Sequence, residues 1–121
     1  MRIRPEQIET MKSLAIANFE QRTIKHLRTY LAEQTCEQTD EQLRLRIRSC
    51  VPRAGEYGLK SQKEIISFVD CTYLVGERFD TDPRYPEFNE ILNQQDSQPV
   101  ERAGTALGMA WGIVTASKIK G

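Results

Sequence analysis

Apolar residues recur every three or four positions along most of the chain, and this spacing predicts helices. The first helix is expected over about residues 5–34, because Pro5 suits a first helical turn. Its apolar stripe is wide enough to contact more than one neighbour. The stripe comprises Ile8, Met11, Ala15, Ile16, Phe19, Ile24, Leu27, Tyr30 and Leu31.

Two capping boxes mark the starts of the next helices. Thr39-Asp-Glu-Gln42 opens a second helix, and Pro52 inside its pattern predicts a kink or a break, because proline removes a backbone donor. Gly55 and Gly58 are expected to finish this element. The inward face of this helix is predicted to be Leu43, Ile47, Cys50, Val51 and Ala54.

Ser61-Gln-Lys-Glu64 opens a third helix, whose apolar residues from Ile65 to Phe79 cover most of the helix circumference. This helix is therefore expected to be the central one. A short helix over 86–94 and a last helix from Pro99 to about Lys118 complete the prediction. The expected fold is an all-α, single-domain bundle of four to five helices spanning residues 1–121.

Composition narrows the possible functions. The 121 residues include 17 Lys and Arg and 17 Asp and Glu, and this zero net charge argues against a nucleic-acid partner. The charged N-terminus lacks the apolar stretch of a signal peptide, so a cytoplasmic location is expected. The three cysteines, Cys36, Cys50 and Cys71, form no C-x-x-C pair, which predicts reduced thiols and no metal site.

Catalytic candidates are few. His26 is the only histidine and has no acid four residues before or after it, and no glycine-rich phosphate loop is present. The sequence thus predicts no catalytic set and no cofactor. A small enzyme that uses Asp70, Asp80 or Asp82 as acid or base is a third-ranked alternative.

Three glycines recur every four residues and share one face of the last predicted helix: Gly104, Gly108 and Gly112. Glycine weakens a helix, so this face needs a compensating contact. The favoured reading is a groove that receives the first or third helix of the same chain. The alternatives are a docking face for a partner helix, with Trp111 as an anchor, or membrane contact through residues 103–117.

Charge is unevenly distributed along the chain. The first sixty residues carry a net charge of +3 and the remaining sixty-one −3. Arg44 and Arg48 share a helix face in the basic half, while Asp80 and Asp82 belong to the acidic stretch. Such polarity can steer a protein partner. Solvated faces, or pairing of the two regions inside the fold, explain it equally well, and the pattern leaves the oligomeric state open.

One stretch resembles a known group of proteins. The segment from Tyr57-Gly-Leu-Lys to Asp70, followed by Phe79-Asp-Thr-Asp-Pro83, is similar to small bacterial proteins encoded near type VI secretion spike and effector genes. The opening Pro5-Glu-Gln-Ile, Phe19 and His26-Leu-Arg also match, so the resemblance covers about residues 5–92. Pro52, Tyr85-Pro-Glu-Phe and the glycine-spaced last helix depart from the family pattern.

The resemblance implies a cytosolic accessory protein that acts on a secreted toxin or on its loading machinery. The resulting hypothesis is a non-catalytic module that binds another protein, as an adaptor or chaperone for a type VI effector. The second hypothesis is an immunity protein that blocks a cognate toxin. Arg44, Arg48, Asp80, Asp82, the three glycines and Trp111 are the predicted partner-binding residues.

Overall fold

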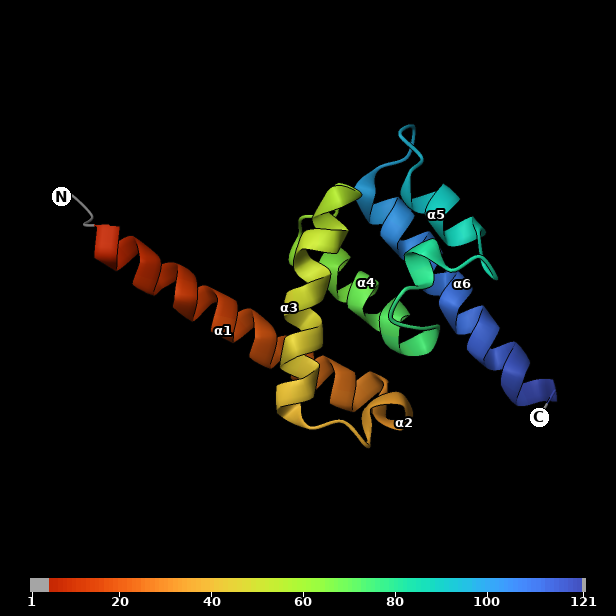
Figure 1. Cartoon of the computed structure of the whole chain (residues 1–121), viewed down its shortest axis with the longest axis horizontal. Coiled ribbons are helices and arrows are strands. Elements are labelled where there is room, and N and C mark those ends of the chain that lie inside the picture. Colours follow the sequence, from red (N-terminus) through yellow and green to blue (C-terminus); the bar gives the residue numbers. More distant parts are fainter. Residues whose placement is uncertain (1–4, 121) are drawn as a thin grey trace.

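The computed structural model describes the backbone of residues 5–120 and the side chains of residues 15–118. Over this range the chain forms one all-α domain without strands, which confirms the predicted fold class (Figure 1). The predicted helices correspond to five of the observed ones, and α2 is additional. The elements are α1 (Pro5–Tyr30), α2 (Ala32–Thr35), α3 (Asp40–Glu56), α4 (Gln62–Leu74), the 3-10 turn η1 (Phe79–Thr81), α5 (Glu87–Leu92) and α6 (Pro99–Lys120).

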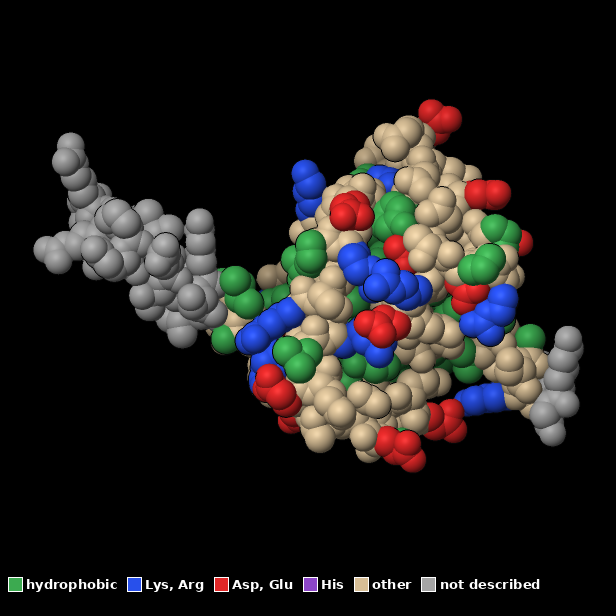
Figure 2. All heavy atoms as spheres, in the orientation of Figure 1, with side chains coloured by type: hydrophobic (Ala, Val, Ile, Leu, Met, Phe, Trp, Pro, Cys, Tyr) green, Lys and Arg blue, Asp and Glu red, His purple; other side chains and the backbone are tan. Residues whose placement is uncertain are grey.

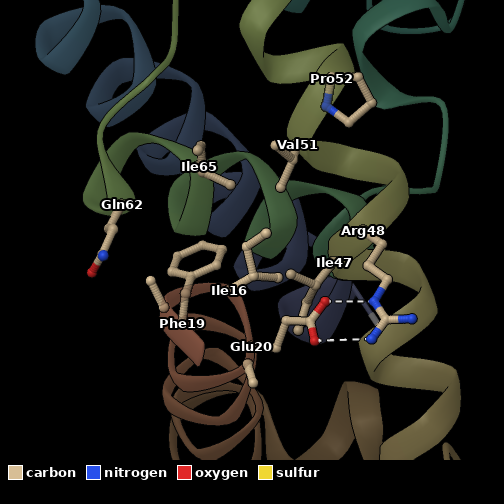
Figure 3. A pocket seen from close by; sticks show the side chains of 11 residues that line it. Ile16, Phe19, Glu20, Ile47, Arg48, Val51, Pro52, Gln62 and Ile65 are labelled. Carbon is tan, nitrogen blue, oxygen red and sulfur yellow. Dashed lines mark hydrogen bonds and ion pairs between the residues drawn. The ribbon is translucent and has the colours of Figure 1, made fainter. Parts of the chain in front are cut away.

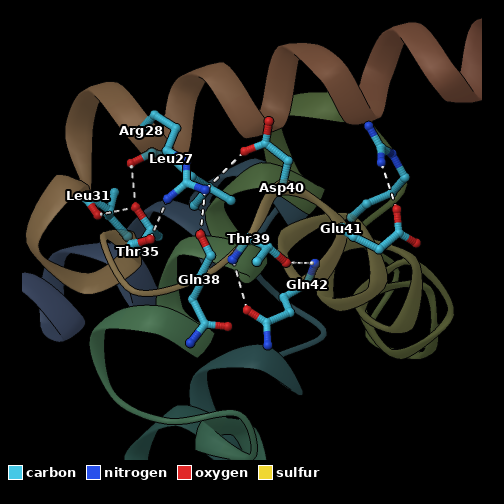
Figure 4. A network of polar contacts seen from close by, with 10 residues as sticks. Leu27, Arg28, Leu31, Thr35, Gln38, Thr39, Asp40, Glu41 and Gln42 are labelled. Atoms are coloured by element: carbon cyan, nitrogen blue, oxygen red, sulfur yellow. Dashed lines mark hydrogen bonds and ion pairs between the residues drawn. The ribbon is translucent and has the colours of Figure 1, made fainter.

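The first helix is shorter than its pattern predicts, because Leu31 leaves the helical conformation, with φ −121° and ψ 42°. The Arg28 guanidinium reaches forward across the following turn (Figure 4). It donates to the carbonyl of Thr35, to that of Gln38 at 2.5 Å and to the Asp40 carboxylate at 2.9 Å. This side chain therefore holds the reversal that brings α3 back across α1.

The cap of α3 forms as predicted: the Gln42 amide donates to Oγ1 of Thr39 at 3.1 Å, and Oε1 of Gln42 accepts from the Thr39 amide at 2.8 Å. Pro52 does not break this helix, so the expectation of a break there is wrong. Pro52 lies close to the C-terminal end, where its missing amide removes a single helical bond. Gly58, with a positive φ of 81°, ends the element as predicted.

Helix α4 is central, as predicted, and contacts α1, α2, α3 and α6. It ends at Leu74 rather than near residue 79, because the chain turns at Gly76 and enters η1. Phe79 then packs back on Phe68 of α4, with ring centroids 4.9 Å apart, and on Phe88 of α5 at 5.2 Å. These aromatic contacts bury η1 and α5 against one end of α4.

Arg102 of α6 joins three parts of the chain. Its side chain is buried, and its guanidinium donates to the backbone carbonyls of Tyr57 at 2.6 Å, Leu92 at 2.5 Å and Ser97 at 3.2 Å. These acceptors lie after α3, at the end of α5 and in the connection to α6. Hydrogen bonds from a charged donor to buried acceptors are among the stronger ones in proteins.

We expect Arg102→Ala to lower the free energy of unfolding by about 3 kcal/mol, because it leaves buried carbonyls without a donor. Urea denaturation measures this change. Arg78→Ala is the control, since Arg78 is exposed, and it should change stability by less than about 0.5 kcal/mol. Equal effects of the two substitutions would contradict a structural role for Arg102.

Candidate functional site

An apolar groove of about 660 Å³ lies between α1, α3 and the start of α4 (Figure 3). The residues that line it are far apart in the sequence, and the crossing of α1 and α3 brings them together. Most of its lining is apolar, with a polar group at one end. The lining residues are Ala15, Ile16, Ala17, Phe19, Glu20, Ile47, Arg48, Val51, Pro52, Gln62 and Ile65.

Two large apolar side chains of the groove are exposed: Ile16 by 55% and Val51 by 40%. The prediction that Val51 faces inward with the rest of its stripe is therefore wrong. Farther along α1, Phe19 and Leu27 are buried, whereas Ala15 and Ile16 are exposed. The apolar stripe of α1 is thus longer than the surface available to bury it. The predicted stripe residues Ile8 and Met11 lie outside the described side chains.

An ion pair closes one end of the groove (Figure 3). Arg48 donates from Nε to Oε2 of Glu20 at 2.6 Å and from Nη2 to Oε1 at 3.2 Å. Arg44 lies nearby, with its Nε 3.7 Å from the same carboxylate. Glu20 is only 3% exposed, so Arg48 supplies the charge that a buried carboxylate requires. The sequence analysis did not single out Glu20 as a groove residue, because its partner Arg48 lies 28 residues away on another helix.

The predicted acidic partner-binding residues are paired within the chain. Asp80 is buried and accepts from Arg53 at 2.5 Å and from the Tyr57 hydroxyl at 2.9 Å. Burial and the Asp80 carboxylate raise the pKa of Tyr57 to about 12. Asp82 pairs with Arg84 at 2.8 Å. Arg53 and Asp80 thus join the basic and acidic regions inside the fold.

Surface charges do not separate into two halves on the face shown in Figure 2, where basic and acidic side chains are interspersed. Arg44 contributes to this mixing, because it also pairs with Glu41 at 2.9 Å. The +3 and −3 halves of the sequence therefore do not translate into two opposed surfaces on this face.

The glycine face of α6 is exposed at Gly104, Gly108 and Gly112. No described atom lies within 4 Å of where a Cβ would stand at any of the three. The favoured reading, a groove filled by another helix of the same chain, is therefore wrong in the described structure. Helix α6 instead packs through an alanine face: Ala103, Ala106 and Ala110.

Trp111 lies beside this glycine face and is 37% exposed. Its role as a partner anchor stays a prediction. As for the membrane alternative, none of the helices among the described residues is long and apolar enough to cross a bilayer.

His26 has an acidic partner that its own helix does not reveal. Its Nε2 lies 2.8 Å from Oδ2 and 3.0 Å from Oδ1 of Asp70, which is 44 residues away on α4. Burial raises the pKa of Asp70 to about 6, although the His26 hydrogen bond acts in the opposite direction. The pair ties α1 to α4. Burial also raises the pKa of the neighbouring Cys71 thiol, which disfavours a nucleophilic thiolate there.

The three carboxylates of the enzyme alternative are not brought together as a set. Asp70, Asp80 and Asp82 bind His26, Arg53 and Arg84, respectively. Across the described part of the chain, no three His, Cys, Asp or Glu side chains are grouped to hold a metal ion. The three cysteines are free thiols, of which Cys36 is exposed. The geometry thus favours the groove over any of these groups as the candidate site.

Comparisons with protein-family models, with curated proteins and with solved structures found no match.

Stability should depend on the ionisation of Asp70. Its pKa of about 6 exceeds the roughly 3.9 of an unfolded chain, so the folded state retains a proton that the unfolded state releases between these values. The stabilisation is therefore present at low pH and is lost as pH rises through about 6. We expect Asp70→Asn, which keeps an acceptor for His26, to gain stability relative to the wild type over this interval.

Urea denaturation at several pH values between about 4 and 8 measures this difference. Asp82→Asn is the matched control, because Arg84 lowers the pKa of Asp82 and no gain with rising pH is expected there. A difference between wild type and Asp70→Asn that does not change with pH would refute the raised pKa.

Gly108→Ala should raise the free energy of unfolding by about 1 kcal/mol, because alanine favours an exposed helix interior and open space surrounds this position. Gly58→Ala is the opposite control, since its positive φ of 81° strains any other residue. Thermal unfolding compares the two. A loss of stability at Gly108 would show that the glycine face packs against another surface in solution.

Proposed function

We propose that this protein is a non-catalytic binding module that receives an amphipathic helix of another protein in the groove between α1, α3 and α4. The observation that supports the proposal is the exposure of Ile16 and Val51 on facing walls of one apolar groove. Contiguous exposed apolar surface with a polar edge is typical of interaction sites. Helix-in-groove recognition uses this kind of surface.

The groove suits a helix with apolar anchors and a polar residue at one end. Ile16, Phe19 and Ile65 offer apolar contacts, and the exposed side of Arg48 borders them. Arg48 and Arg44 are already paired with Glu20 and Glu41, so this end of the groove is polar and balanced in charge.

The resemblance over residues 5–92 suggests the biological setting. We propose that the bound protein is a type VI secretion effector and that this chain is its cytoplasmic adaptor or chaperone. The alternative is an immunity protein, which would have to abolish the activity of its toxin. Co-expression separates the two, since growth inhibition by the toxin persists beside an adaptor and disappears beside an immunity protein.

Ile16→Glu tests the groove directly. A carboxylate among the apolar walls should weaken binding of the proposed type VI effector by roughly tenfold or more. Affinity is measured by titration calorimetry with the purified effector, and circular dichroism checks that the variant stays folded. Arg48 is a poorer choice, because its loss would leave buried Glu20 unpaired.

Leu45→Glu is the matched control. Leu45 has the same exposed fraction as Ile16, 55%, but it does not line the groove. Its substitution should leave the affinity unchanged. Equal affinity of wild type, Ile16→Glu and Leu45→Glu would show that the groove does not bind the effector.

A further inference from the structure

We draw no further inference here: the strongest candidate, the exposed face of α6 that carries Gly104, Gly108 and Gly112 beside Trp111, is a stripe of small residues, and nothing in the described part of the chain shows what covers it.

Discussion

The domain depends on one buried cation. Arg102 lies on α6, yet the carbonyls that it binds belong to Tyr57, Leu92 and Ser97, which end or follow other helices. Helix ends expose carbonyls that need donors, and a buried end without one is costly. A single guanidinium meets this need at several ends together, because its donors are fixed in one plane. The positions of α5 and of the end of α3 relative to α6 follow from this contact.

Large apolar side chains are buried in one part of the molecule and exposed in another. Around α4, Phe68, Phe79 and Phe88 contact one another and are buried. Where α1 and α3 cross, Ile16 and Val51 remain exposed in an open groove. The Glu20–Arg48 ion pair borders this opening, so the groove has apolar walls and one polar end. The binding role proposed above follows from this unburied apolar surface.

Several features of the fold were predictable because their causes are local. The side-chain oxygens of Thr39 and Ser61 accept hydrogen bonds from backbone amides three residues later, so the starts of α3 and α4 can be recognised from nearby residues in the sequence. The end of α1 before Leu31 was not predictable, since the turn that follows is held by Arg28 through groups 7 and 10 residues farther along the chain. The exposed glycine face of α6 was also misjudged. Periodicity shows which residues share a face, but not whether another helix covers it.

For this protein, helix content, helix starts and the faces of each helix are determined by the sequence itself, because they depend on contacts within about four residues. The tertiary structure alone decided which charges meet and which apolar face stays open. Glu20 with Arg48 and His26 with Asp70 are separated by 28 and 44 residues. Such pairs form only when helices pack together, and the same packing leaves Phe19 buried and Ile16 exposed.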